Sequence, residues 1–238
     1  MVSAVIFAGG TGSRMKNTTK PKQFLELHGK PIIIHTLEHF ENHTLIDAIV
    51  VVCIEEWIDY LNKLLVKFQI NKVIKVVPGG KTGQMSIYNG LNVIHQSEFR
   101  NDIVLIHDGV RPLINAETIT NNIECVRKNG SAITVKPVIE TVIQVDDEHN
   151  IVDVVERSNC QTAVAPQGFF FNDIYEAHLK AQSEEMFDFT DSATLMRYYG
   201  FKLNTVMDGS ENIKITTPSD FYIFRAIYEL RENAQILG

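Results

Sequence analysis

Short apolar runs alternate with amphipathic stretches along most of the chain. Continuous apolar runs rich in β-branched residues, such as AIVVVCI at 48–54, are typical of strands covered on both faces of a sheet. Stretches with apolar residues three or four positions apart, such as 56–68, are typical of helices that pack on such a sheet. These patterns predict strands at 2–7, 48–54, 73–77, 103–106, 132–138 and 201–207, and helices at 32–40, 56–68, 86–94, 192–199 and 221–230, with one more helix that includes Ile123 and Val126.

The alternation of strands and helices predicts an α/β fold, with a Rossmann-like, mostly parallel sheet, helices on both faces and right-handed crossovers. The length of 238 residues allows one or two domains at ~150 residues per domain. No repeat, low-complexity linker or clear boundary divides the chain. We therefore expect a single domain that spans residues 1–238.

The alternation stops between residues 141 and 155, where two strand-like runs follow one another. The runs 141–145 and 151–155 flank the polar loop DDEHN at 146–150, which predicts a β-hairpin. A two-stranded hairpin is only marginally stable in water by itself. We therefore expect this protruding β-arm, at about 139–157, to pack on a second subunit and form a homodimer.

Composition narrows the classes of function. A net charge of −7 argues against general nucleic-acid binding, so any site for a polyanion must be local. The three cysteines have no CxxC spacing, which favours a reducing compartment and argues against a zinc site. The N-terminus shows no signal-peptide pattern, and no run approaches the ~20 apolar residues of a membrane span. We expect a cytoplasmic protein that binds neither membrane nor nucleic acid.

A glycine-rich loop follows the first predicted strand. Gly9, Gly10 and Gly12 let the backbone approach a ligand closely and direct several N–H groups toward it. Arg14 and Lys22 bring positive charge to the same segment, which suits a nucleoside triphosphate. The loop matches neither GxxxxGK[ST] nor a dinucleotide fingerprint, whose last glycine or alanine is replaced by methionine. A tight turn with solvated basic residues is the alternative interpretation.

Other candidate segments also lie where predicted strands end. Residues 8–14, 78–80 and 107–111 follow three strands, and a fourth segment follows Val138. Ligands of open α/β sheets bind outside the carboxyl ends of the strands, so these segments are expected to converge. Each has an ordinary alternative: a simple turn for the glycines, a helix cap for Asp108 and a buried imidazole for the preceding histidine.

Ordered motifs along the whole chain resemble the cytidylyltransferases that act on polyol phosphates. The motifs are AGGTGSRM (8–15), KPKQF (20–24), GG before Ser86, HDGVRP (107–112), Glu140–Thr141, VVER (154–157), APQGF (165–169), Thr190–Asp191 and NIKITTPSD (212–220). The family includes 2-C-methyl-D-erythritol 4-phosphate cytidylyltransferase and ribitol-5-phosphate cytidylyltransferase, and its fold is nucleotide-diphospho-sugar transferase-like. The resemblance implies a nucleotidyltransferase that converts CTP and a polyol phosphate into a CDP-polyol and pyrophosphate.

The resemblance also implies roles for individual residues. Arg14, Lys22 and Lys214 would bind the triphosphate and stabilise charge at the α-phosphate, and Arg157 would hold the polyol phosphate, from the arm of a partner subunit. Since Mg²⁺ bridges phosphate oxygens, the ion is implied as cofactor, with Asp108 as the candidate ligand. The implied CTP-binding residues are Ala8, Gly9, Gly10, Thr11, Gly12, Gly80, Ser86 and Asp108, and the implied acceptor-binding residues are Asp108, Arg111, Thr141 and Arg157.

The acceptor is the open question. The amino-terminal third resembles the ribitol-phosphate enzymes more closely, which favours D-ribitol 5-phosphate, CDP-ribitol as product and a role in cell-wall polymer biosynthesis. The segment 190–201 resembles the methylerythritol enzymes of isoprenoid biosynthesis, which is the alternative. Gly83 and Ala165 depart from the residues that are usual in the family, Arg and Thr. A regulatory module without turnover and an NAD-dependent oxidoreductase are two further, disfavoured alternatives.

Overall fold

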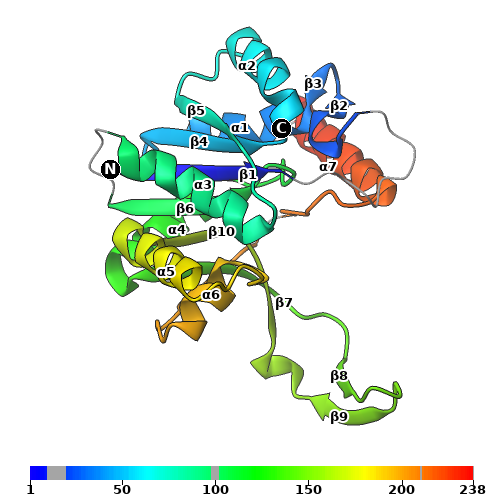
Figure 1. The fold of residues 1–238 in the computed structure, drawn as a ribbon. Coiled ribbons are helices and arrows are strands. Elements are labelled where there is room, and N and C mark those ends of the chain that lie inside the picture. The colour runs from blue at the N-terminus through cyan, green and yellow to red at the C-terminus, as the bar shows by residue number, and fades with distance from the viewer. Residues whose placement is uncertain (10–19, 98–101, 210, 238) are drawn as a thin grey trace.

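A seven-stranded sheet forms the centre of the protein in the computed structural model, which describes residues 1–9, 20–97, 102–209 and 211–237 (Figure 1). The strand order is β11-β7-β10-β6-β1-β4-β5. All neighbouring pairs are parallel except those that β10 forms with β6 and β7. The predicted mostly parallel α/β sheet is thus confirmed. Its strands are β1 (Val2–Ala8), β4 (Ala48–Cys53), β5 (Val73–Pro78), β6 (Ile103–Asp108), β7 (Ser131–Pro137), β10 (Gln161–Phe170) and β11 (Thr205–Met207).

Helices cover both faces of this sheet, as predicted. Successive residues of a strand point to opposite faces, so β1 buries Ala4 and Ile6 on one side and Val5 on the other. The first side packs against α1 (Ile32–Glu41), α2 (Ile58–Lys67) and α4 (Ala116–Asn129). The second packs against α3 (Gly83–Gln96), α5 (Phe171–Ser183) and α6 (Ser192–Tyr198). The last helix, α7 (Pro218–Leu237), packs with the short β2–β3 pair (Glu26–Leu27 and Lys30–Pro31) beside the sheet.

Several boundaries differ from the predictions, most of all those of β11 and α7. Strand β11 is shorter than the predicted 201–207, and α7 is longer than the predicted 221–230. Asp220 explains where α7 begins, because its carboxylate accepts hydrogen bonds from the backbone N–H groups of Thr216 and Thr217, at 2.8 and 2.7 Å. The sequence patterns assigned neither β10 nor α5, although β10 lies between β6 and β7 in the sheet.

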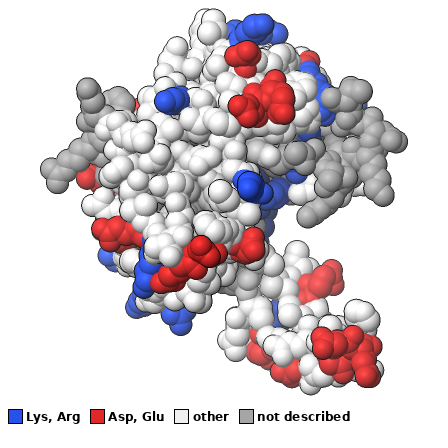
Figure 2. All heavy atoms as spheres, in the orientation of Figure 1, with Lys and Arg blue, Asp and Glu red and all other residues white. Residues whose placement is uncertain are grey.

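The predicted hairpin forms and is separate from the central sheet. Strands β8 (Val142–Val145) and β9 (Ile151–Val155) make a two-stranded antiparallel sheet that projects from the body of the molecule (Figure 1). Three apolar side chains on it, Ile151, Val152 and Val154, are each 60–62% exposed. Acidic side chains lie around its tip (Figure 2). The arm therefore presents apolar surface that its own chain does not cover. No helix in the described part of the chain combines the length and apolar character needed to span a membrane.

Candidate active site

The carboxyl ends of β1, β5 and β6 converge at one edge of the sheet, as predicted. The N–H of Gly109, just after β6, donates to the carbonyl of Phe7 in β1 at 2.8 Å. The N–H of Gly79, just after β5, donates to the carbonyl of Cys53 in β4 at 2.9 Å. A Cβ at Gly79 would lie 3.9 Å from the Cα of Gly9, so the loops after β1 and β5 touch. Four parallel strands thus bring their loops to one place.

The turn after β5 forms a side-chain-free surface that Ser86 holds in position. The N–H of Gly80 donates to Ser86 Oγ at 2.9 Å, and the Ser86 hydroxyl donates to the carbonyl of Thr82 at 2.8 Å. A Cβ at Gly80 would lie 2.5 Å from the Cβ of Met85, so only glycine fits there without displacement. Together with Ala8 and Gly9, this turn gives a ligand close access to backbone. Ser86 acts first as an organiser of the turn, a role that the motif alone did not indicate.

Lys22 lies beside the end of β1. It begins the 3-10 turn η1 (Lys22–Phe24), and its neighbour Gln23, which is buried, donates from Nε2 to the carbonyl of Ala8 at 2.8 Å. This bond joins the KPKQF motif to the glycine-loop motif. The other predicted residues of this region, Gly10, Thr11, Gly12 and Arg14, lie outside the described residues.

A compact charge cluster lies at the end of β6. The carboxylate of Asp108 receives Lys214 Nζ on Oδ1 at 2.7 Å and Arg111 Nε on Oδ2 at 2.8 Å. Arg111 also donates from NH1 to the carbonyl of Asn212 at 3.0 Å, which ties the late NIKITTPSD segment to β6. Three residues from two motifs far apart in the sequence, all predicted to act on the substrates, are therefore in direct contact.

The Asp108 carboxylate is charged at neutral pH. Burial by itself would raise its pKa, but the neighbouring charges of Lys214 and Arg111 and their hydrogen bonds outweigh burial and lower the pKa to about 2. At the adjacent His107, burial outweighs the effect of the Asp108 charge, which would raise the pKa. Burial lowers its pKa to about 3, and its ring packs against Phe40 at 5.1 Å between centroids. His107 is therefore a neutral core residue, in agreement with the alternative interpretation from sequence.

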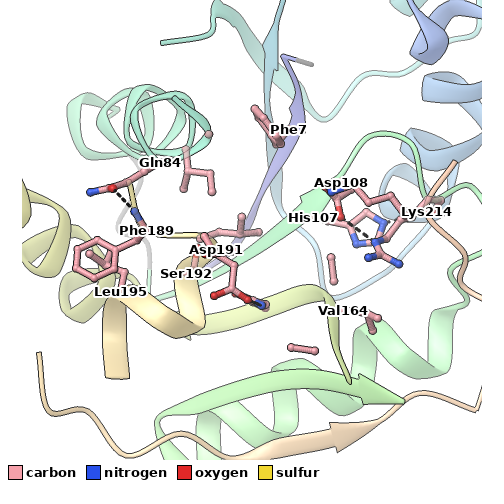
Figure 3. A pocket seen from close by; sticks show the side chains of 18 of the residues that line it. Phe7, Gln84, His107, Asp108, Val164, Phe189, Asp191, Ser192, Leu195 and Lys214 are labelled. Carbon is pink, nitrogen blue, oxygen red and sulfur yellow. Dashed lines mark hydrogen bonds and ion pairs between the residues drawn. The ribbon is translucent and has the colours of Figure 1, made fainter. Parts of the chain in front are cut away.

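A pocket of about 280 Å³ opens beside this cluster (Figure 3). Asp108 and Lys214 border one end, and Gln84, Asp191 and Ser192 lie across the cavity from them. The wall between is made by β10, which contributes residues 163–165 and Gln167, and other lining residues include Phe7, Gly83, Ile87, His178 and Thr190. Sequence reasoning missed Gln84, His178 and Ser192.

Side-chain hydrogen bonds of Gln167 and Asp191 hold the wall of the pocket together. Gln167 Nε2 donates to Asp191 Oδ2 at 2.8 Å, and Gln167 Oε1 accepts from the N–H of Ala193 at 2.9 Å. Asp191 also caps α6 by accepting from the N–H of Thr194 at 2.8 Å. The APQGF and Thr190–Asp191 motifs therefore meet, and the signal for Gln167 was present in the first of them.

The arm residues do not reach the pocket of their own chain. Thr141 and Arg157 are exposed at the base of the arm and do not line the cavity. The Arg157 guanidinium donates from NH1 to the carbonyl of Ile139 at 2.8 Å, a contact within the arm. One chain therefore brings Asp108, Arg111 and Lys214 together but not Thr141 or Arg157.

Few protein ligands for a metal ion are present in the described ranges. No group of three or more His, Cys, Asp or Glu side chains there could enclose an ion. Asp108, the candidate ligand, has a cationic partner on each carboxylate oxygen. These residues fit an Mg²⁺ ion that is held mainly by phosphate oxygens, with one carboxylate at most from this cluster.

Comparison with known proteins gives consistent results over the whole chain. The family model described as 2-C-methyl-D-erythritol 4-phosphate cytidylyltransferase matches residues 2–230. A ribitol-5-phosphate cytidylyltransferase of Vibrio parahaemolyticus is 56% identical over 235 residues, which is 99% of this chain and 99% of that protein. A 2-C-methyl-D-erythritol 4-phosphate cytidylyltransferase of Clostridium botulinum is 40% identical over 223 residues, 94% of this chain and 97% of that protein. The crystal structure of the 4-diphosphocytidyl-2C-methyl-D-erythritol synthase from Anaerococcus prevotii superposes with a TM-score of 0.83 at 29% identity, covering 96% of this chain and 98% of that one.

Proposed function

The chain belongs to the 2-C-methyl-D-erythritol 4-phosphate cytidylyltransferase family of nucleotidyltransferases, and from that premise we propose that it transfers the cytidylyl group of CTP to D-ribitol 5-phosphate. The choice of acceptor rests on one observation. The chain is 56% identical to a ribitol-5-phosphate cytidylyltransferase over nearly its full length, against 40% for a methylerythritol enzyme. The products would be CDP-ribitol and pyrophosphate. A cytoplasmic supply of CDP-ribitol for cell-wall polymers is part of the same proposal.

The reaction needs alignment and charge neutralisation rather than a covalent nucleophile. An oxygen of the acceptor phosphate bonds to the α-phosphorus of CTP, the bond from that phosphorus to the oxygen bridging the β-phosphorus breaks, and that oxygen leaves with pyrophosphate. Both reactants are anions, so cations aimed at the reacting phosphates are the main means of lowering the barrier. When bound, Mg²⁺ would neutralise part of the triphosphate charge.

The described residues supply several parts of such a site. The backbone of Ala8, Gly9 and Gly80 would accommodate cytidine, with Ser86 fixing the turn. Lys22, held beside β1, would act on the triphosphate, and we propose the same role for Arg14, which lies outside the described residues. Lys214 would meet the phosphates from the opposite side, and the ion pair with Asp108 at 2.7 Å would position its ammonium group. Asp108 and Arg111 would thus position Lys214 and Asp108, respectively, as well as contact the substrates.

We further propose that a second protomer completes the site with Thr141 and Arg157. The arm exposes apolar residues that the described part of its own chain does not cover, and its two predicted site residues do not line the pocket beside Asp108. A guanidinium forks onto a phosphate in two hydrogen bonds, which suits Arg157 to the acceptor phosphate.

Complementation tests the shared site. At an acceptor concentration low enough that Arg157→Ala and Lys214→Ala protomers each show little activity alone, a mixture should regain about a quarter of wild-type activity, since half of randomly paired dimers then carry one intact site. Mixtures that stay inactive although the protomers exchange would exclude a site built from two chains.

An acceptor panel tests the reaction itself. Pyrophosphate release should be followed at saturating CTP and Mg²⁺ with ribitol 5-phosphate, 2-C-methylerythritol 4-phosphate and glycerol 3-phosphate, and kcat/KM compared. We expect ribitol 5-phosphate to lead by at least tenfold. No release with any acceptor would refute a cytidylyltransferase. A methylerythritol phosphate that leads instead would establish the second candidate, which the family model and the relative from Clostridium botulinum favour.

A further inference from the structure

The pocket has a second polar end, away from the cations. Three of its lining residues, Gly83 of α3, His178 of α5 and Ser192 of α6, come from the helices on one face of the sheet, and we refer to these three residues as the distal end. In Figure 3, Ser192 lies across the cavity from Asp108 and Lys214. Neither His178 nor Ser192 belongs to the residues expected to act on the phosphates.

The distal end holds buried polar atoms that have no partner among the described residues. Both ring nitrogens of His178 and the Oγ of Ser192 lack a hydrogen bond. The two residues are only 1% and 3% exposed. Buried polar groups in folded proteins are nearly always hydrogen-bonded, and a group that is not is commonly completed by a bound molecule. Since both residues line the cavity, a molecule in the cavity is the available partner.

The chemistry of these atoms fits hydroxyl groups. Burial lowers the pKa of His178 to about 4, so at neutral pH the ring has one nitrogen that donates and one that accepts. The hydroxyl of Ser192 can also do both. A phosphate monoester only accepts hydrogen bonds at neutral pH and calls for cations, which are at the other end of the pocket. An alcohol both donates and accepts, and so satisfies either residue.

The size of the cavity also points to a small ligand. Its volume of about 280 Å³ is close to the lower limit of small-molecule pockets, ~300 Å³, which suits a sugar-sized chain better than a whole nucleotide. Gly83 keeps the distal end open, because a Cβ built there would meet no atom within 4 Å. A larger side chain at this position would therefore project into free space beside the pocket and not into the core.

We propose that the distal end binds hydroxyl groups of the acceptor's polyol chain, far from its phosphate, and thereby selects acceptors by length and hydroxylation. This inference rests on the proposed function. With the acceptor phosphate held at the Asp108 end of the pocket, where Arg157 of the partner subunit would reach it, the carbon chain would run along β10 toward Ser192. His178 and Ser192 then act as specificity residues, and Gly83 sets the room available.

Three variants test the proposal in the full-length enzyme. Ser192→Ala, His178→Phe and Gly83→Leu are assayed for pyrophosphate release with ribitol 5-phosphate and with erythritol 4-phosphate, which is one carbon shorter. We expect Ser192→Ala and His178→Phe to raise the KM for ribitol 5-phosphate at least fivefold and leave the KM for CTP within twofold. Gly83→Leu should penalise ribitol 5-phosphate more than the shorter acceptor. Ser183→Ala, at the exposed end of α5, is the matched control and should match wild type.

The results distinguish a failure of the proposed function from a failure of this inference. A wild-type enzyme that releases no pyrophosphate with any polyol phosphate refutes the proposed function and this inference with it. A wild-type enzyme that works on ribitol 5-phosphate, with Ser192→Ala unchanged in acceptor KM or changed equally for acceptor and CTP, refutes the inference alone. Melting temperatures show whether each variant is folded, and if His178→Phe is not, Ser192→Ala, which removes one oxygen, decides the matter.

Discussion

Replacing Asp108 with asparagine tests whether its carboxylate organises the cation cluster. Asparagine keeps the shape and loses the charge. Arg111, whose side chain is only 10% exposed, then has no anion, and breaking a buried pair on one side costs about 3–5 kcal/mol. Arg111 keeps its bond to the carbonyl of Asn212, which places the expected loss near the lower value. The pair with Lys214 adds little to this loss of stability, because the Lys214 side chain is 42% exposed and solvent screens the interaction. We expect a decrease in the free energy of unfolding of about 3 kcal/mol.

The pH dependence of this loss follows from the pKa of Asp108. The pKa is about 2 in the folded protein against 3.8 as the ordinary value, so the folded state holds the proton less tightly. The carboxylate therefore contributes stability that is fully present above the unfolded pKa and is lost as the pH falls toward 2. Between pH 8 and pH 5 the carboxylate is ionised in both states. The difference between wild type and Asp108→Asn should accordingly stay constant over that range.

Urea unfolding at pH 8, 6.5 and 5, followed by circular dichroism, measures this difference. Asp59→Asn is the matched control: it makes the same chemical change on the exposed surface of α2 and should alter stability by less than ~1 kcal/mol. Turnover of Asp108→Asn, measured at a temperature where the variant is folded, should fall more than tenfold, because Lys214 loses the partner that positions it. A loss below ~1 kcal/mol, or one that varies between pH 8 and pH 5, would contradict a buried, permanently charged Asp108.

Three other predictions concern separate parts of the molecule. Lys22→Ala should lower kcat more than tenfold, since a charge aimed at the transition state contributes more than ~1.4 kcal/mol; near-normal turnover would exclude that role. Arg157→Ala should raise the KM for the polyol phosphate much more than the KM for CTP, and an unchanged acceptor KM and kcat would remove it from the site. His35 is buried, and its Nε2–H donates to the carbonyl of Leu27. Burial lowers the pKa of His35 from 6.5 to about 4, so the folded protein holds the ring in its neutral form. The stability that this provides is fully present above pH 6.5 and is lost as the pH falls toward 4. His35→Gln should thus reduce the loss of unfolding free energy between pH 7 and pH 5 by about 2 kcal/mol, and an equal loss in both proteins would contradict a neutral His35.

Sequence patterns predicted the helices and strands whose own residues show a clear apolar run or periodicity. The buried parallel strands β1, β4 and β6 are continuous apolar runs, because both faces are covered by helices. The loops at Gly9, Gly80 and Asp108 were expected to converge because ligands of open α/β sheets bind outside the carboxyl ends of the strands. The family was predicted from motifs that span the chain. The partner of a polar residue was not predictable in this way. Ser86 was predicted to bind CTP, and its hydrogen bond with the N–H of Gly80 was not foreseen, because that contact depends on where α3 begins.

Strand β10 was not predicted from the sequence, although it forms part of the candidate site. Its sequence QTAVAPQGFF has no apolar period, and proline in a central strand normally argues against that assignment. The strand tolerates Pro166 because its pairing with β7 shifts register between Ala163 and Gln167, so the proline falls where the ladder is interrupted. Gly168 lies where a Cβ would come within 2.8 Å of Leu105, which only the packed sheet could reveal. The interrupted stretch, residues 163–165 and Gln167, also forms a wall of the pocket beside Asp108, so the irregularity that made β10 hard to predict lies at the candidate site.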